Sequence, residues 1–106
     1  MSALGLIETT SLPAMIEACD AATKAASVRI VAIERIGCAL QTCFIRGDVA
    51  AVLAAVEAGS AAAARIGHLV GQHVIPRPHA ALSSVFPVDG PLPEQGRGTE
   101  NVCCSC

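Results

Sequence analysis

Short apolar runs alternate along this chain with longer stretches in which apolar residues recur every three or four positions. The short runs are rich in β-branched residues and end at turn residues, so they predict strands over 3–9, 28–36, 40–46 and 69–75. The longer stretches predict two amphipathic helices. The order strand, helix, strand, strand, helix, strand predicts an α+β, ferredoxin-like βαββαβ domain, with a four-stranded antiparallel sheet and both helices on one face.

The first predicted helix begins after Thr9-Thr10-Ser11, and Pro13 falls in its first turn, where a missing N–H costs little. Asp20 and Lys24 are spaced as an i,i+4 ion pair. The stripe expected to face the core steps by four and three, through Leu12, Ile16, Cys19, Thr23 and Ala26.

The second predicted helix follows Asp48, which we expect to cap its N-terminus, and Gly67 is a natural C-terminal stop. Its apolar stripe is narrow and built of small residues, which suits close packing on a sheet. The stretch 49–64 is expected to be too short and too weakly apolar to cross a bilayer. The stripe consists of Val49, Val52, Leu53, Val56, Ser60, Ala63, Ala64 and Gly67.

The strands over 28–36 and 40–46 are predicted to form a hairpin around the small-residue corner Gly37-Cys38-Ala39. Apolar residues occupy both sides of the first of these strands, so both of its faces should be covered. We expect one side to carry Val28, Ile30, Ala32 and Ile36, and the other Val31 and Ile33.

The chain changes character after the last predicted strand. Pro76 and Pro78 end that strand, and 79–85 is expected to hold a short helical turn. From Pro87 onward the sequence is rich in proline and glycine, with little to bury. We therefore divide the chain into a folded domain, 1–87, and a flexible cysteine-containing tail, 88–106.

Composition adds an expectation about assembly. Of the 106 residues, 53% are hydrophobic, only 15% are charged and 2% are aromatic. A chain rich in small apolar residues and poor in charged ones is expected to bury part of its surface against other protein chains. We therefore expect an obligate oligomer. The net charge of −2 and the lack of a basic run argue against a nucleic-acid partner. The N-terminus does not have the pattern of a signal peptide, and no membrane partner is expected.

Four motifs together resemble bacterial microcompartment shell proteins of the single BMC-domain, hexameric type. The resemblance runs from about Ala3 to Pro87. It implies a cyclic homohexamer shaped as a flat tile, with a central pore for small metabolites. The motifs are Leu4-Gly5-Leu6-Ile7-Glu8-Thr9, Glu34-Arg35-Ile36-Gly37, Ile45-Arg46-Gly47-Asp48-Val49 and Val74-Ile75-Pro76-Arg77-Pro78-His79.

The same resemblance implies that tiles pack edge to edge with other shell proteins, in the shell of a cytoplasmic organelle that encloses enzymes. Gly37, Cys38 and Ala39 fall on the family's pore loop, and Lys24 and Arg77 on its hexamer–hexamer edge. The protein is then structural rather than an enzyme, with no cofactor, and the enclosed enzymes are further candidate partners. The pore tip here is Gly-Cys-Ala, where the family commonly has Gly-Ser-Gly, and the cysteine-containing tail is not part of the family pattern.

Six cysteines leave a second function open. A ring of Cys38 thiols could serve as small neutral pore residues, bind a metal or iron–sulfur cluster, or sense redox state. Cys103 and Cys106 form one C-x-x-C pair, and two tails could together complete a tetrahedral metal site. The alternative function is therefore a redox or metal-carrying shell component. Cys19 and Cys43 are interpreted as small core residues.

Catalytic chemistry finds little support. His68, His73 and His79 are not at ligand spacing on one element, and the acidic residues Glu8, Glu34 and Glu57 are separated by whole elements. An unrelated ferredoxin-like regulatory or ligand-binding module is the remaining alternative; it would form a dimer or trimer with a saturable ligand and no lattice.

Overall fold

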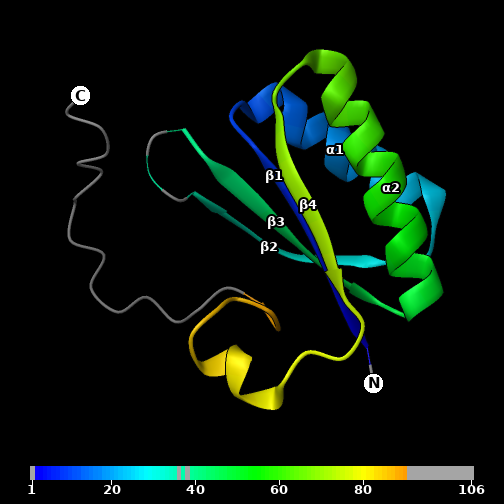
Figure 1. The fold of residues 1–106 in the computed structure, drawn as a ribbon, viewed down its shortest axis with the longest axis vertical. Helices are drawn as coiled ribbons and strands as arrows, with labels where there is room; N and C mark the ends of the chain where they lie inside the picture. The colour runs from blue at the N-terminus through cyan, green and yellow to red at the C-terminus, as the bar shows by residue number, and fades with distance from the viewer. Residues whose placement is uncertain (1, 36, 38, 91–106) are drawn as a thin grey trace.

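The structure is a computed structural model, which describes residues 2–35, 37 and 39–90. It confirms the predicted order of elements and the ferredoxin-like fold (Figure 1). A short 3₁₀ helix follows the last strand, in the segment where a helical turn was expected. The elements are β1 (Ala3–Thr9), α1 (Leu12–Ala25), β2 (Arg29–Arg35), β3 (Gln41–Gly47), α2 (Val49–Ile66), β4 (Leu69–Ile75) and η1 (Ala80–Ser84).

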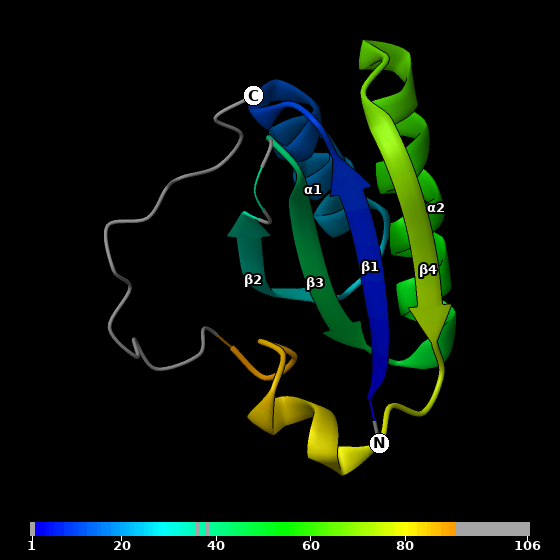
Figure 2. The same cartoon turned by 60° about the vertical axis from the view of Figure 1, so that its left-hand side comes forward.

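The sheet has the strand order β2-β3-β1-β4, and every neighbouring pair is antiparallel. Both helices lie on one face of it (Figure 2). The register defines two ends of the sheet. At one end Thr9 lies opposite Gln41 and Leu69, and at the other Leu4 lies opposite Arg46 and Ile75.

The main core lies between the sheet and the helices, and β1 contributes alternate residues to it. Ala3 and Ile7 are fully buried there. Gly5 lies on the same side, and a Cβ at that position would come within 2.6 Å of Val56 Cγ2 and 2.8 Å of Val52 Cγ1. Gly5 therefore allows α2 to pack close against the sheet.

The predicted core stripe of α1 is wrong by about one position around the helix. Leu12 is 46% exposed and Ile16 60% exposed, while only the half-buried Cys19 and Ala26 of that stripe pack against the core. α1 packs against α2 mostly through small side chains, which allow a close approach, while Leu12 and Ile16 face outward and Met15 is its one large buried residue. The buried residues are Ala14, Met15, Ala18 and Ala22.

The stripe predicted for α2 is right in part. Val49 and Leu53 are exposed, at 38% and 51%, and Ala64 is exposed as well. As in α1, most of the buried side chains of α2 are small, and its buried face contacts both α1 and the sheet. The buried residues are Val52, Ala55, Val56, Gly59, Ser60, Ala62 and Ala63.

The ends of α2 were predicted with mixed success. Asp48 occupies the N-cap position, but its side chain makes no capping hydrogen bond. Gly67 ends the helix in the left-handed region at φ 94°, and its N–H donates to the carbonyl oxygen of Ala63, as expected of a C-terminal glycine. The helix has 18 residues and is long and apolar enough, by those criteria alone, to span a membrane, which corrects the estimate from sequence. Its packing on β1, β4 and α1 makes it the core helix of this fold.

A β-bulge in β2 overturns the predicted sides of that strand. The pairing with β3 shifts register between Ile30 and Ala32, so that two residues oppose one. Ile30 packs against the helix-side core, whereas Ala32 joins the cluster on the other face. Beyond the bulge the strand therefore alternates in the opposite phase. Ile36 lies outside the described residues.

The second face of the sheet carries its own small apolar cluster. Leu4, Ala32, Phe44 and Val88 are buried there, and Leu82 of η1 packs against them. The segment after β4 folds back beneath the sheet to reach this place (Figure 2). Val88 was assigned to the tail from sequence, but in the structure it contributes to this cluster.

Candidate pore turn and assembly edges

The predicted pore corner is the turn that joins β2 to β3. The N–H of Leu40 donates to the carbonyl oxygen of Gly37 at 2.8 Å, which closes the turn. Gly37 has a φ of 52° and Ala39 a φ of 66°, and both residues are exposed. Cys38 lies between them but outside the described residues.

Ala39 is the one described residue other than glycine with a positive φ. An L-residue in the left-handed region brings its Cβ close to the following carbonyl oxygen, at a cost of roughly 1–2 kcal/mol. Glycine would take this conformation without that cost. The Gly-Ser-Gly tip common in the resembled family would therefore carry glycine at this position.

Lys24 lies in the last turn of α1 and is highly exposed. Its Nζ is 2.8 Å from Asp20 Oδ2, which confirms the predicted i,i+4 pair. The hydrogen bond and charge of Asp20 raise the pKa of Lys24, which favours its protonated form. Arg77 follows β4 between Pro76 and Pro78 and is also exposed.

The two predicted edge residues lie at the end of the sheet opposite the pore turn. The turn joins Arg35 to Gln41, and Gln41 pairs with Thr9 at the end of β1. Arg77 follows Ile75, which pairs with Leu4 at the start of β1. α1 returns along the sheet after β1, so Lys24 also lies toward the Leu4 end, shortly before the chain enters β2 (Figure 1).

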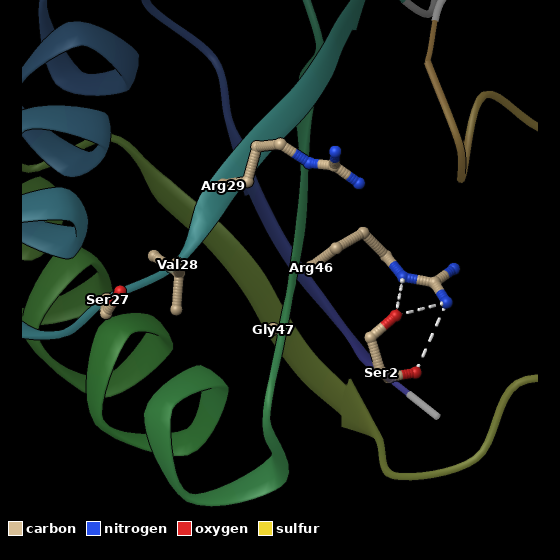
Figure 3. Close-up of a pocket in the computed structure, with 6 residues that line it drawn as sticks. All are labelled: Ser2, Ser27, Val28, Arg29, Arg46 and Gly47. Carbon is tan, nitrogen blue, oxygen red and sulfur yellow. Dashed lines mark hydrogen bonds between the residues drawn. The ribbon is translucent and has the colours of Figure 1, made fainter.

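An open pocket at the Leu4 end of the sheet was not foreseen from the sequence. It has a volume of about 310 Å³, and Figure 3 shows its lining: Ser2, Ser27, Val28, Arg29, Arg46 and Gly47. Arg29 and Arg46 are cross-strand partners on β2 and β3. Like charges in that arrangement repel, so nearby acceptors must offset them.

Several oxygen atoms around Arg46 offset its positive charge. Its guanidinium donates to Ser2 Oγ at 2.8 Å, to the Ser2 carbonyl oxygen at 3.2 Å and to the Val88 carbonyl oxygen at 3.3 Å (Figure 3 shows the bonds to Ser2). Asp89 Oδ1 lies 3.6 Å from Nη1. Through these contacts Arg46 holds Ser2, which precedes β1, and the segment after η1 against the sheet. An arginine inside an apolar strand was the signal that could have revealed it.

The two core cysteines are closer together than the sequence indicates. Cys43 on β3 is fully buried and Cys19 on α1 is half-buried. Their Sγ atoms share a hydrogen bond at 3.6 Å, and Met15 Sδ is 3.8 Å from Cys19 Sγ. The hydrogen bond lowers the pKa of Cys19 against the opposing effect of burial, while the same bond and burial raise the pKa of Cys43.

The structure lends no support to the metal alternative. Over residues 2–35, 37 and 39–90, no group of three or more His, Cys, Asp or Glu side chains is placed to hold a metal ion. Two of the histidines make hydrogen bonds within the protomer: His79 Nδ1 accepts from the N–H of the nearby Ala81, and His68 Nδ1 bonds the hydroxyl of Thr10, which is distant in sequence. Cys103 and Cys106, like Cys38, fall outside the described part of the chain.

Comparison with known proteins agrees with the fold and with the motifs. Residues 3–78 match the BMC domain family. The bacterial microcompartment shell protein EutM of Salmonella typhimurium is 59% identical over 88 residues, which cover 83% of this chain and 92% of EutM. The shell protein PduA of Citrobacter freundii is 51% identical over 85 residues, which cover 80% of this chain and 91% of PduA.

Two further relatives extend the comparison. The carboxysome shell protein CcmK2 of Synechococcus elongatus is 46% identical over 88 residues, which cover 81% of this chain and 86% of CcmK2. The crystal structure of a microcompartment protein from Desulfitobacterium hafniense DCB superposes with a TM-score of 0.72 at 32% identity, over 89% of this chain. This chain spans about half, 51%, of that protein's length.

These relatives are structural shell proteins rather than enzymes, and the agreement spans the folded part of the chain from β1 beyond β4. The resemblance inferred from the four motifs is confirmed. The chain belongs to the BMC-domain family and is a structural shell protein of a bacterial microcompartment.

Proposed function

We propose that this shell protein forms a cyclic homohexamer that tiles edge to edge and carries a central pore for small metabolites. The observation that carries the proposal is the placement of the pore turn and the edge residues at opposite ends of one sheet. A protomer with the Gly37–Leu40 turn toward a shared axis would present Lys24 and Arg77 at the outer rim. The pore and the tile edge then come from a single orientation of the protomer.

The distribution of exposed apolar residues supports a ring. β2 and β4 are the two edge strands, and each carries a large exposed apolar side chain, Ile33 at 47% and Val70 at 51%. A protomer with apolar residues on two different sides suits head-to-tail contacts, in which one side of each copy meets the other side of the next. Such contacts close into a ring when the rotation between copies permits.

The pore follows from the same arrangement. Six copies of the exposed turn would surround an opening rimmed by Gly37, Ala39 and Cys38. Small side chains leave room for a solute, and backbone groups of the turn give it a polar lining. A thiol is a weak hydrogen-bond partner, so this rim is less polar than one lined by serine. In this proposal the pore lets small metabolites cross the shell, and the protein catalyses no reaction.

The outer rim would join neighbouring tiles. Lys24 and Arg77 are exposed cations that can donate to backbone carbonyl or carboxylate oxygens of a facing hexamer. The partners are then other copies of this hexamer and other shell proteins, with enclosed enzymes on one side of the layer. The shell that they build lies in the cytoplasm.

Electron microscopy of the purified protein tests the edge assignment. Wild-type protein should form extended sheets or tubes at high concentration, whereas Lys24→Ala and Arg77→Ala should give isolated hexamers. Asp20→Ala is the matched control, because it removes the partner of Lys24 within the chain and leaves the lysine in place. Sheets that persist in both cation variants, or that vanish in Asp20→Ala alone, would contradict the proposed edge.

A further inference from the structure

A pair of thiols inside the protomer has no part in the proposed pore or edge. Cys19 comes from α1 and Cys43 from β3, 24 positions later in the chain, and their Sγ atoms are 3.6 Å apart. The two side chains therefore meet across the contact between helix and sheet. Cys43 is fully shielded from solvent, whereas Cys19 is half-buried, so Cys19 is the more accessible residue of the two.

The separation of the sulfur atoms is close to what a covalent bond requires. A disulfide has an S–S length near 2.05 Å, so the two atoms must approach by about 1.5 Å. Rotation of the two side chains and a small movement of α1 can supply this approach. Three of the four buried side chains of α1 are alanines and the fourth is Met15, so few side chains need to repack.

We propose that Cys19 and Cys43 form a reversible dithiol–disulfide site, oxidised by low-molecular-weight disulfides, that fastens α1 to β3. The proposal rests on the geometry of the protomer and does not depend on the hexamer or the pore. It assigns a modification site to two residues that the sequence suggested were ordinary core positions.

The reaction proceeds in two exchange steps. The thiolate of Cys19 attacks one sulfur of the external disulfide RS–SR, forms a mixed disulfide and releases RS⁻, which takes up the proton lost by Cys19. The thiolate of Cys43 then attacks the Cys19 sulfur, closes the Cys19–Cys43 bond and expels the second RS⁻, which takes up the Cys43 proton. The protein loses two protons and two electrons, which together equal two hydrogen atoms, and the external disulfide becomes two thiols.

The surroundings of the two thiols suit these roles. The pKa of Cys19 is lowered by its hydrogen bond to Cys43, which favours the more exposed thiol as the first nucleophile. The pKa of Cys43 is raised, so Cys43 stays protonated until the mixed disulfide forms beside it. Cys43 needs no access to solvent, because its target is the adjacent Cys19 sulfur.

The bond would have consequences for stability. It closes a loop that contains the end of α1, all of β2 and the start of β3, and a cross-link of that length restricts the unfolded chain. The oxidised protomer should therefore unfold at a higher temperature than the reduced one. Lys24 lies on α1 as well, so the bond would also restrict the movement of the helix that carries this predicted edge residue.

The test uses full-length protein equilibrated in glutathione buffers of increasing disulfide-to-thiol ratio, then trapped and digested. Tryptic cleavage leaves Cys19 in 1–24 and Cys43 together with Cys38 in 36–46. The Cys38→Ser variant removes that ambiguity. In this variant we expect linked 1–24 and 36–46 peptides, about 2 Da lighter than the two free peptides together because two hydrogen atoms leave, and lost on addition of dithiothreitol.

Cys19→Ser is the matched control, because its half-buried position tolerates a hydroxyl better than the buried Cys43 site would. It should give no linked peptide, and its thermal midpoint should not change with the buffer ratio, while that of Cys38→Ser rises on oxidation. A stable glutathione adduct on Cys19 without a linked peptide would overturn the proposal. So would the absence of any reaction at either thiol across the whole range of ratios.

Discussion

α2 presents Gly59 to the backbone carbonyl oxygen of Ala18 on α1, at a spacing that leaves no room for a side chain. A Cβ at position 59 would lie 2.8 Å from that oxygen and 2.8 Å from Ile7 Cδ1. Backbone atoms cannot rotate away, so the two helices must separate to admit any larger residue. The helix pair therefore depends on this glycine.

Gly59→Val should destabilise the protein by about 1–3 kcal/mol, the usual cost of overpacking a filled core. Chemical denaturation followed by circular dichroism measures the change. Ala61→Val introduces the same β-branched side chain at an exposed position of the same helix, without the close contact, and should cost only about 0.5 kcal/mol. Equal losses in the two variants would refute the close contact.

Ala39→Gly should stabilise the protein. Ala39 has a φ of 66°, and glycine removes the clash of Cβ, worth roughly 1–2 kcal/mol. Part of that gain is offset by the greater freedom of glycine in the unfolded chain, about 0.4–1 kcal/mol. A net gain of about 0.5–1 kcal/mol should appear in the denaturation midpoint. Ala80→Gly, at an exposed position whose φ is not positive, should show a loss instead.

Arg46→Met should cost about 1–3 kcal/mol, because it removes the hydrogen bonds to Ser2 and Val88 and leaves their part-buried oxygens unpaired. The ion pair to the 66% exposed Asp89 adds little. Hydrogen exchange should show faster exchange at the start of β1. Arg29→Met, at the opposite position on β2, is exposed and should leave both measurements nearly unchanged.

Ser60→Ala should be neutral or stabilising, by up to about 1 kcal/mol. The Ser60 hydroxyl is buried and has no hydrogen-bond partner among the described residues, so alanine removes a polar group that gains nothing from burial. Thermal unfolding measures the change. A loss above 1 kcal/mol would show that the hydroxyl has a partner outside those residues, in the rest of the chain or in a neighbouring copy.

The sequence predicts the elements and their order well, because β-branched runs, Gly67 and the prolines after β4 are local signals. It predicts the buried faces less well. Leu12, Ile16 and Leu53 are among the large apolar residues of their helices, yet they lie exposed, because mostly small side chains fill the contact between the two helices. In a shell protein, hydrophobic residues also serve surfaces between copies, so hydrophobicity alone does not identify the core of one protomer.

Other features depend on contacts between distant parts of the chain. The bulge at Ile30 reverses the sides of β2, and no local pattern marks it. The approach of Cys19 to Cys43 and the bonds of Arg46 to Ser2 and Val88 join positions 24 to 44 residues apart. The pore turn and the edge residues were predicted from the resemblance to the family. Their positions at opposite ends of the sheet follow from the strand register, which the structure provides.

Native mass spectrometry of the purified full-length protein tests the central claim most directly. The proposal predicts one dominant species at about six times the 10.7 kDa mass of the chain, stable on dilution. A monomer, or a closed assembly of any number of copies other than six, would contradict the account of the ring and of the pore at its centre.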